Sequence, residues 1–270
     1  MRIAHLSDLH FGRHVSSDRV DALRTDLVNA DPELVVITGD ITDRGTRRQF
    51  HRALQWLKSL HIPFICVPGN REVSFDAFWE WAVPRLALLR YQSYFGPKDQ
   101  IVHVSEKHKV VFFGVNSVHP LPSWPGKLGR KKRQWLGTRA ADFQSYFKVL
   151  FLHHPVLPVP GSSSNWAHTF SDAGKVLKIC SESGISLILQ GHKHRSSVMD
   201  LRISDTNARI VVSCSGAPLR PEWDAIYHLI RISPTTVLVE PREFIEGRFA
   251  PRPASVISLD GSGPSTTVKP

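Results

Sequence analysis

Short apolar runs alternate with longer amphipathic segments over the first two-thirds of the chain. Runs of strand length predict β-strands at residues 2–6, 34–38, 63–67, 110–115, 148–152 and 186–190. Between them, apolar residues recur every three or four positions, which predicts helices near residues 20–27, 50–57 and 173–180. Ser171 precedes the last of these helices as its expected N-cap. Strands that alternate with helices in this way are typical of βαβ units around a buried sheet.

The pattern changes after residue 195. Apolar runs at 197–203, 209–214, 226–232 and 235–240 follow one another through short turns, with no helical pattern between them. This succession predicts an antiparallel meander. We therefore expect a mixed α/β domain in which a second, largely antiparallel sheet packs on the first.

Length and composition favour one folded domain with a tail. The chain has 270 residues, near the upper limit of roughly 250–300 for a single core. Hydrophobic residues make up 41% and charged residues 21%, which excludes disorder along the whole length. From about residue 247 the composition shifts to Gly, Pro, Ser and Thr. We expect a domain at 1–246 and a C-terminal tail at 247–270 with little to bury.

Charge, cysteine content and the absence of long apolar runs indicate the kind of ligand and the cellular location. Lys and Arg number 34 against 24 Asp and Glu, a net charge of +10 that attracts anions such as phosphates and nucleotides. Cys66, Cys180 and Cys214 are odd in number and lack CxxC spacing, so we interpret them as reduced core residues. The N-terminus turns polar too early for a signal peptide, and no apolar run approaches the ~20 residues of a membrane span. We expect a soluble, cytoplasmic protein with no membrane partner.

Polar side chains follow directly on five of the predicted strands. They belong to Asp8, His10, Asp40, Asn70, His153, His154, His192 and His194. In α/β sheets, ligands collect outside the carboxyl ends of the strands, so these side chains are expected to lie together. Each motif alone is a weak signal, because Asp-x-His occurs by chance and Gly-Asp, Gly-Asn and His-His-Pro occur in ordinary turns and loops. Taken together, however, oxygen or imidazole donors after five of the predicted strands are a strong signal, and they indicate a metal site.

Five short motifs, taken in order, resemble those of the calcineurin-like metallophosphoesterases. They are SDLHFG at 7–12, GDITDRG at 39–45, GNRE at 69–72, LHHP at 152–155 and GHKH at 191–194. Within that family the chain is most similar to the bacterial class III cyclic-nucleotide phosphodiesterases, and the resemblance extends from residue 1 to about 240. It implies an α/β fold, an αββα sandwich of two mixed β-sheets flanked by helices.

The resemblance also implies a site for two metal ions. The ligands it assigns are Asp8, His10 and His194 for the first ion, Asn70, His153 and His192 for the second, and Asp40 as the bridge between them. Two such cations can share a hydroxide that attacks phosphorus, and they can stabilise the leaving oxygen. Oxygen and nitrogen donors without thiolate suit Mn, Fe, Zn, Co or Ni, and the sequence does not distinguish among these metals.

Four residues receive a catalytic assignment: Asp40, Asn70, Arg71 and His154. His154 follows a ligand directly, and it either supports that ligand from behind or is an ordinary loop histidine. His5, by contrast, lies inside a predicted strand and is interpreted as a packed core residue.

Arg71 stands where the family has a histidine that contacts phosphate and assists the leaving group. Arginine supplies charge and a forked hydrogen bond, but its pKa above 12 prevents it from donating a proton at neutral pH. We interpret Arg71 as a phosphate clamp, with the acid lost or supplied by a residue such as His14 or His119. In the alternative, Arg71 turns outward and pairs with Glu72 or meets solvent.

Two further segments allow a nucleic-acid interpretation. The basic run at 130–133 could contact phosphates, although a solvated helix face is favoured. The aromatic loop at 165–170 could stack on a base, cover the site or simply pack.

The sequence is compatible with three classes of function. The leading hypothesis is a dinuclear metal-dependent phosphoesterase that hydrolyses phosphodiesters, most of all cyclic nucleotides, by attack of a metal-bound hydroxide. Its partner would be a small anionic phosphoester. The alternatives are a nuclease or a broad phosphomono- and diesterase of the same superfamily; a nuclease is less favoured because we expect no DNA-binding cap after residue 240. A non-catalytic scaffold is least favoured, since all seven ligand positions hold competent residues. A homodimer is compatible with each.

Overall fold

The computed structural model describes the chain except residues 13, 74–87, 120–124, 163–169, 261–265 and 269–270. Its strands are β1 (Arg2–Leu6), β2 (Leu34–Thr38), β3 (Phe64–Val67), β4 (Gln100–Ser105), β5 (Val110–Val115), β6 (Phe147–Phe151), β7 (Ile185–Gln190), β8 (Ser197–Ile203), β9 (Ala208–Cys214), β10 (Ile226–Ile232), β11 (Thr236–Ile245), β12 (Arg248–Pro251), β13 (Ala254–Ser258) and β14 (Thr266–Val268). Its helices are α1 (Ser17–Ala30), α2 (Arg47–Ser59), the 3₁₀ turn η1 (Asn70–Glu72), α4 (Leu89–Phe95), α5 (Gly129–Ala141) and α6 (Ala173–Glu182).

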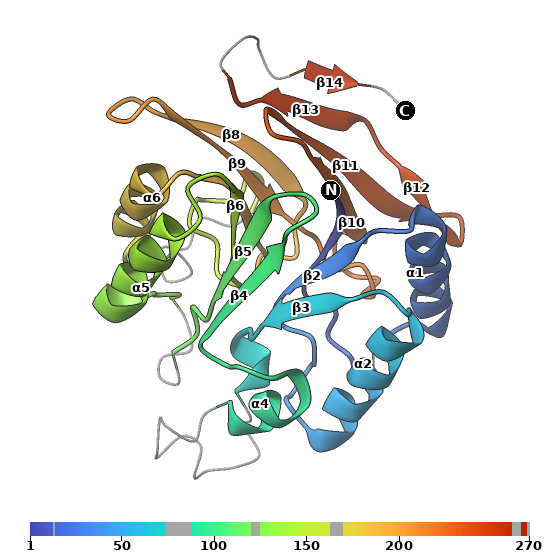
Figure 1. The fold of residues 1–270 in the computed structure, drawn as a ribbon. Helices are drawn as coiled ribbons and strands as arrows, with labels where there is room; N and C mark the ends of the chain where they lie inside the picture. The colour runs from blue at the N-terminus through green and yellow to red at the C-terminus, as the bar shows by residue number, and fades with distance from the viewer. Residues whose placement is uncertain (13, 74–87, 120–124, 163–169, 261–265, 269–270) are drawn as a thin grey trace.

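The strands form two sheets that pack face to face (Figure 1). The first sheet runs β14-β13-β11-β10-β1-β2-β3, with β12 paired to β11, and the second runs β4-β5-β6-β7-β9-β8. Each sheet is mixed: β1 pairs β2 in parallel but β10 antiparallel, and β7 pairs β9 in parallel while β8 and β9 are antiparallel. Helices α1 and α2 lie outside the first sheet, and α5 and α6 outside the second (Figure 1). The expected αββα sandwich of two mixed sheets is confirmed.

Successive side chains of a strand point to opposite faces of its sheet, so they pack into two different hydrophobic cores. In β2, Val35 and Ile37 pack toward the helices of the first layer, whereas Leu34 and Val36 pack between the two sheets. Because both faces are covered, the strand is fully buried and is apolar at every position but the last, Thr38. This explains why the strands that carry the candidate site appear in the sequence as continuous apolar runs.

The expectation of one meander after residue 195 is wrong. Strands β8 and β9 form a hairpin in the second sheet, whereas β10 and β11 form a hairpin in the first. The chain crosses between the sheets through residues 215–225, a segment without regular structure. The polarity pattern is the same for a hairpin in either sheet, so it could not reveal this crossover. The pattern also missed β4 and α4.

The expectation that residues 247–270 have little to bury is also wrong. Strands β12 and β13 pair with β11 and extend the first sheet. Phe249 is buried against the helices, and Ile257 is buried between the sheets. The Gly, Pro and Ser content averaged over the whole segment concealed two short apolar runs.

Helix α6 begins one residue later than expected, with Asp172 rather than Ser171 at the N-cap position. The Asp172 carboxylate does not cap its own helix. It accepts hydrogen bonds from the backbone N–H groups of Leu128 and Gly129 and pairs with Arg133, so it ties down the start of α5.

The basic run at 130–133 lies on α5, as expected for a surface helix. Arg130 and Lys131 are exposed. Lys132 donates to the carbonyl of Asn116 at 2.7 Å, and Arg133 pairs with Asp172. Half of the run is therefore used to attach the helix to its neighbours, which weakens its interpretation as a nucleic-acid patch.

Candidate functional site

The five polar strand ends meet at one edge of the sandwich. The loop after β1 lies against the loop after β2: the N–H groups of Asp8 and His10 donate to the carbonyls of Gly39 and Asp40 at 3.0 and 2.9 Å. The loop after β7 joins the loop after β6 through the Gly191 N–H and the His153 carbonyl at 2.9 Å. Main-chain hydrogen bonds therefore hold these loops together, independently of their side chains.

The backbone at these strand ends is left-handed at five of the candidate residues. The φ angles are 52° at Asp8, 47° at His10, 48° at Asp40, 72° at His192 and 53° at His194. Positive φ is uncommon for residues other than glycine and costs of order 1–3 kcal/mol each. Such a concentration of unfavourable backbone geometry is characteristic of functional sites, where it aims side chains that a regular strand would direct elsewhere.

The first group of donor atoms comes from Asp8, His10, His194 and Asp40. His194 Nε2 lies 3.2 Å from Asp8 Oδ1 and 3.1 Å from His10 Nε2. His10 Nε2 lies 3.7 Å from both Asp8 Oδ1 and Asp40 Oδ2. Burial alone would raise the pKa of the Asp8 carboxyl, but His194 and His10 outweigh it and hold that pKa well below its usual range.

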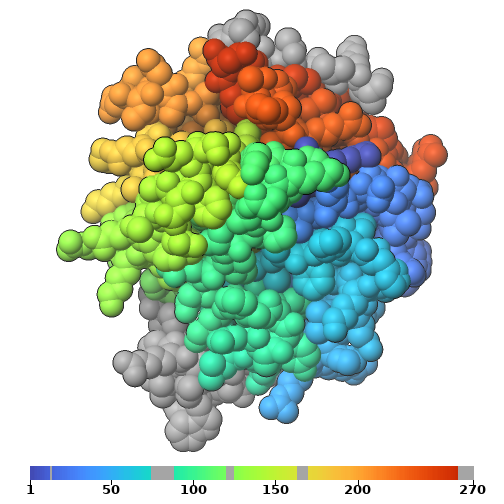
Figure 2. Space-filling model, viewed as in Figure 1, coloured from blue at the N-terminus to red at the C-terminus, as the bar shows by residue number. Residues whose placement is uncertain are grey.

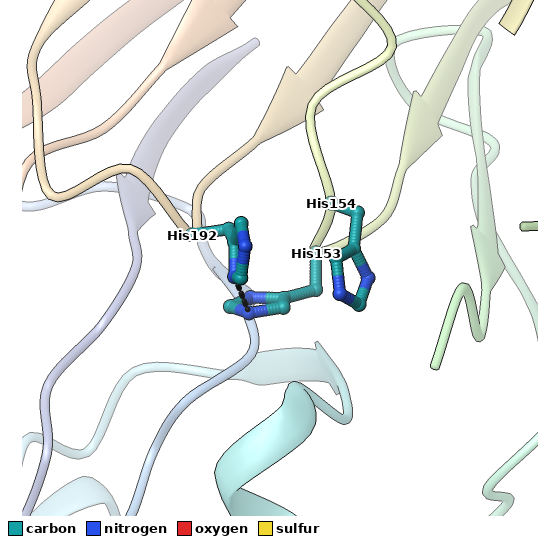
Figure 3. Close-up of side chains that lie close together, drawn as sticks. All are labelled: His153, His154 and His192. Atoms are coloured by element: carbon teal, nitrogen blue, oxygen red, sulfur yellow. Dashed lines mark hydrogen bonds between the residues drawn. The ribbon is translucent and has the colours of Figure 1, made fainter. Parts of the chain in front are cut away.

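The second group comes from Asn70, His153, His192 and the other oxygen of Asp40. Asn70 Oδ1 lies 3.0 Å from His153 Nε2 and 3.0 Å from His192 Nδ1. The two imidazole nitrogens are 3.2 Å apart, and this contact is the dashed line in Figure 3. Asp40 Oδ1 lies 3.5 Å from His153 Nε2. Asp40 thus directs one carboxylate oxygen to each group.

Both groups fit a metal ion. Donors bound at about 2.1 Å to one ion and separated by roughly 90–110° are about 3.0–3.4 Å apart, close to the spacings observed. Asp8 Oδ1 is buried and accepts no well-directed hydrogen bond from a described residue, although Oδ2 accepts two, from Ser7 Oγ at 2.5 Å and the His192 N–H at 2.9 Å. Burial and the neighbouring His153 hold the pKa of His192 well below its usual value, which favours the neutral imidazole that binds metal.

Close packing under the site explains two of the glycines in the motifs. A Cβ at Gly191 would lie 1.8 Å from Ser7 Oγ, and a Cβ at Gly69 would lie 2.3 Å from the Asp40 backbone nitrogen. No side chain fits at either point without moving a loop that carries a candidate ligand.

Glu72 holds two of these loops together from beneath. Its fully buried carboxylate accepts hydrogen bonds from the N–H groups of Gly69 and Thr42, at 2.7 and 2.9 Å, and from the Thr42 hydroxyl at 3.0 Å. Burial and the nearby Asp40 carboxylate raise the pKa of Glu72 to about 8. The sequence predicts no role for Glu72 beyond a possible pair with Arg71.

Arg71 contacts the site through its main chain. Its backbone N–H donates to Asp40 Oδ1 at 2.9 Å, while its side chain is exposed. The pairing with Glu72 considered as an alternative is not observed, because the Glu72 carboxylate is turned inward to Gly69 and Thr42. The main chain of Arg71 is therefore attached to the bridging carboxylate, and its side chain extends from there at an exposed position.

His154 is buried behind the second group (Figure 3). Its Nδ1 is 2.9 Å from the Ser117 hydroxyl, and its ring centroid is 4.6 Å from that of His192. Its ring nitrogens come close enough to those of His153 and His192 for the three imidazoles to form a possible metal group by themselves. His154 is thus packed against two candidate ligands and held by Ser117.

His5 is a core residue that belongs to a buried polar chain. Its Nε2 lies 3.0 Å from Thr38 Oγ1, and its Nδ1 lies 3.0 Å from Ser213 Oγ. Ser213 Oγ continues to His228 Nδ1 at 2.7 Å, and His228 Nε2 contacts Ser196 Oγ at 2.7 Å. Burial lowers the pKa of His228 to about 3, so the chain is built from neutral rings.

Trp223 is the site residue that sequence reasoning missed. Its indole stacks on the His194 imidazole and lies beside that of His10. Trp223 follows no strand end and belongs to no motif, so only the folded structure reveals its position.

The residues considered as alternative acids lie in different surroundings. His14 is exposed on the loop after β1. His119 is half-buried with its Nε2 donating to the Lys127 carbonyl at 3.1 Å, and burial lowers its pKa. Of the aromatic loop at 165–170, residues 165–169 lie outside the described residues, and Phe170 is buried in the core of the second layer.

Two remaining expectations can be compared with the structure. Cys66, Cys180 and Cys214 are free and buried, as expected for core residues. Among the residues that the structure describes, no helix is both long and apolar enough to cross a membrane.

Comparison with known proteins connects this geometry to a family. A family model described as calcineurin-like phosphoesterase matches residues 1–196. A probable glycerophosphodiester phosphodiesterase, GpdQ, of Arcobacter nitrofigilis is 27% identical over 128 residues, which span 47% of this chain but only 44% of that protein. The 3′,5′-cyclic adenosine monophosphate phosphodiesterase CpdA of Escherichia coli K12 is 23% identical over 234 residues, or 83% of this chain and 78% of that protein.

A solved structure agrees with the fold. The dimetal phosphatase from Danio rerio superposes with a TM-score of 0.67 at 14% identity and covers 96% of this chain and 99% of its own. The family model spans well over half of the chain and includes all five motifs and both donor groups. The resemblance drawn from those motifs is confirmed, and the chain belongs to the calcineurin-like phosphoesterase family.

Proposed function

We propose that the protein is a phosphodiesterase that uses two transition-metal ions, with 3′,5′-cyclic nucleotides as its substrate class. The observation that carries this proposal is the position of Asp40, whose two oxygens face two separate groups of oxygen and nitrogen donors. One carboxylate between two donor groups is the arrangement that a dinuclear site requires. Mn, Fe, Zn, Co or Ni would suit the donor set, which contains no thiolate.

The ligands would be those named from the motifs. Asp8, His10 and His194 would hold the first ion, Asn70, His153 and His192 the second, and Asp40 both. The two ions, when bound, supply a nucleophile derived from water at neutral pH and positive charge for the phosphate oxygens. Main-chain donors to Asp40 and Asp8 restrict the orientation of both carboxylates.

Arg71 and His154 would serve the reaction in different ways. The Arg71 side chain is exposed on a backbone that donates to Asp40, and its guanidinium would contact the phosphate oxygens of a substrate at the site. His154 would act through its neighbours, because its ring is packed behind His192 and contacts Ser117. It is therefore proposed as a positioning residue.

Ser7 and Cys66, the serine and cysteine nearest the motifs along the chain, are poorly suited to form a covalent intermediate. Ser7 is buried and donates its hydroxyl hydrogen to Asp8 Oδ2. Burial raises the pKa of the Cys66 thiol to about 12, so the thiolate is scarce at neutral pH. Both observations support direct attack by water on phosphorus.

The substrate class rests on the relatives. The bacterial proteins that this chain resembles are named as phosphodiesterases of cyclic nucleotides and of glycerophosphodiesters. A small anionic phosphodiester is the chemistry these names share. The buried free cysteines are compatible with the reducing cytoplasm, which we propose as the location.

A substrate screen with metal analysis tests the proposal. Purified protein would be analysed for bound metals and then assayed with cyclic AMP, a glycerophosphodiester, bis(p-nitrophenyl) phosphate and p-nitrophenyl phosphate. We expect about two metal ions per chain, hydrolysis of the diesters, and loss of both with a chelator. Faster cleavage of the monoester would favour a broad phosphatase, and a metal-free, inactive protein would favour a scaffold.

A further inference from the structure

A cavity of about 470 Å³ lies beside the candidate site, between the loop after β1 and the beginning of α2. Gly12 and His14 line one side, and Asp43 belongs to the loop after β2. Arg48 and Arg52 line the other side from one face of α2, four residues apart. Helix α2 is at the molecular surface, so the cavity is accessible to a ligand (Figures 1 and 2).

The lining of this cavity is strongly positive. Arg44, Arg48 and Arg52 contribute three permanent positive charges, and Asp43 contributes the single carboxylate. That carboxylate is already neutralised, because it lies 3.9 Å from Arg44 Nε and 3.7 Å from Arg220 Nη1. Arg48 and Arg52 form no ion pair with any residue that the structure describes, so their charge is available to an anion.

The cavity is close to the candidate metal ligands along the chain. Gly12 is two residues from His10, and Asp43 is three residues from Asp40. Since an extended residue spans at most about 3.6 Å, the corresponding Cα atoms are separated by no more than about 7 and 11 Å. A small molecule can therefore reach from one place to the other.

Side-chain contacts also connect the two places. Arg220, which is 7% exposed, lies beside Asp43 at the cavity and holds its guanidinium 4.8 Å from the Trp223 ring centroid. Trp223 in turn stacks on His194. Arg220 and Trp223 thus form a chain of contacts from Asp43 to the first donor group.

We propose that this cavity binds a second phosphate group of the substrate, while the scissile diester lies at the two donor groups. Arginine forks recognise phosphate oxygens by paired, charge-assisted hydrogen bonds, and two unpaired arginines on one helix face offer such forks together. The proposal rests on the proposed phosphodiesterase function and extends its substrates from 3′,5′-cyclic nucleotides, which have one phosphate, to diesters that carry a further phosphate, such as a nucleotide chain end.

Two substrates with one leaving group test this assignment. The p-nitrophenyl ester of thymidine 5′-phosphate has one phosphate, and the same ester with an added 3′-phosphate has two. We expect the wild-type protein to have a kcat/KM roughly 3- to 10-fold higher for the second, as two exposed charged pairs would provide. This advantage should disappear in Arg48→Gln/Arg52→Gln and shrink with rising salt. Arg47→Gln, on the same helix but outside the cavity lining, should retain it.

The outcomes separate the cavity from the proposed reaction. If the ratio of the two kcat/KM values is the same in all three proteins, the cavity does not bind the second phosphate and the inference is wrong. If no protein hydrolyses either ester, the proposed function fails. Binding of thymidine 3′,5′-bisphosphate then tests, without any hydrolysis, whether the cavity binds phosphate. Tighter binding to the wild type than to Arg48→Gln/Arg52→Gln then supports the cavity, and equal binding overturns it.

Discussion

The indole ring of Trp223 stacks on the imidazole of His194, with ring centroids 3.6 Å apart and an interplanar angle of 27°. The same indole lies 5.1 Å from the His10 ring. One aromatic side chain thus contacts two imidazoles of the first donor group. His194 is the more exposed of the two, at 19% of its side chain against 0% for His10, so it depends more on this contact for its orientation.

Replacing Trp223 should weaken the first metal site selectively. Side chains that orient metal-binding histidines are typically worth 10- to 100-fold in metal affinity. We therefore expect Trp223→Ala to lower the affinity of one of two metal ions by at least about 10-fold, as measured by metal titration. Trp223→Phe keeps an aromatic plane and should lose much less. Equal loss of both ions, or none, would contradict this positioning role.

Asp40→Ala should abolish the dinuclear site. The substitution removes the carboxylate that faces both donor groups, and it removes the acceptor of the Arg71 N–H. We expect loss of at least one metal ion per chain, by elemental analysis, and of nearly all diester hydrolysis. Asp21→Ala, at an exposed position of α1, is the matched control and should change neither quantity. Full activity with native metal content in Asp40→Ala would exclude the dinuclear mechanism.

Glu72→Gln should destabilise the fold as well as the site. The buried carboxylate accepts three hydrogen bonds, and an amide in its place presents an N–H₂ group to at least one of these donors. A buried donor left unsatisfied costs about 1–3 kcal/mol. Urea denaturation at pH 9, where Glu72 with its pKa of about 8 is mostly ionised, should show a loss of this size, whereas Glu182→Gln, on the surface of α6, should show almost none. A neutral result for Glu72→Gln would mean that the two loops do not depend on this carboxylate.

The buried His228 predicts a loss of stability in acid. Burial lowers its pKa to about 3 in the folded state, while the unfolded chain titrates near 6.5. Between these values the unfolded state binds more protons, so the free energy of unfolding falls as the pH decreases below 6.5. At pH 5 the contribution is about 2 kcal/mol.

A pH series of urea denaturation on the wild type and His228→Gln isolates this contribution. Glutamine cannot take up the proton, so the stability difference between the two proteins should decrease by about 2 kcal/mol from pH 7 to pH 5. The carboxylates titrate in both proteins and cancel in the difference, and so does the effect of burial on His5, the main cause of its lowered pKa; the smaller effect of His228 on His5 does not cancel. A difference that is constant with pH would show that His228 is not kept neutral by the fold.

The continuous apolar strands and the polar residues after them were predictable because both follow from local chemistry. A strand covered on both faces is a nearly continuous apolar run, as in β2 up to Ile37, and polar donors such as Asp40 follow where the strand ends. Which sheet each hairpin joins was not predictable, because β8–β9 and β10–β11 are both pairs of strands joined by a short turn, although they belong to different sheets. Sheet membership is decided by long-range packing, which the alternation of residues does not encode.

The details of the site needed the folded chain for a related reason. The left-handed backbone at Asp8 and His194 is imposed by the surrounding loops, against the intrinsic preference of both residue types. Trp223 reaches His194 only because the crossover at 215–225 passes over the first donor group. A lone tryptophan in an irregular segment carries no sequence signal for this position.

Arg71 gives the most specific prediction about the reaction. A histidine there could donate a proton to a departing alkoxide, which is typically worth ~10²- to 10⁴-fold in rate. Arginine offers electrostatic stabilisation of the phosphate only and does nothing for a poor leaving group. The wild-type rate should therefore depend steeply on leaving-group pKa. We expect Arg71→His to flatten this dependence and Arg71→Ala to weaken substrate binding without flattening it.

The test measures hydrolysis rates of a series of aryl phosphodiesters with the wild type, Arg71→His and Arg71→Ala, and compares how steeply each rate depends on leaving-group pKa. The substitutions leave the backbone N–H of residue 71 on Asp40 Oδ1, so metal content should be equal in all three and serves as the control. Because the Arg71 side chain is exposed and does not pair with Glu72, a new imidazole at this position is free to turn toward a leaving oxygen. If the three slopes coincide while binding is unchanged in Arg71→Ala, the side chain points into solvent during turnover. The phosphate clamp would then have to be sought elsewhere on the chain.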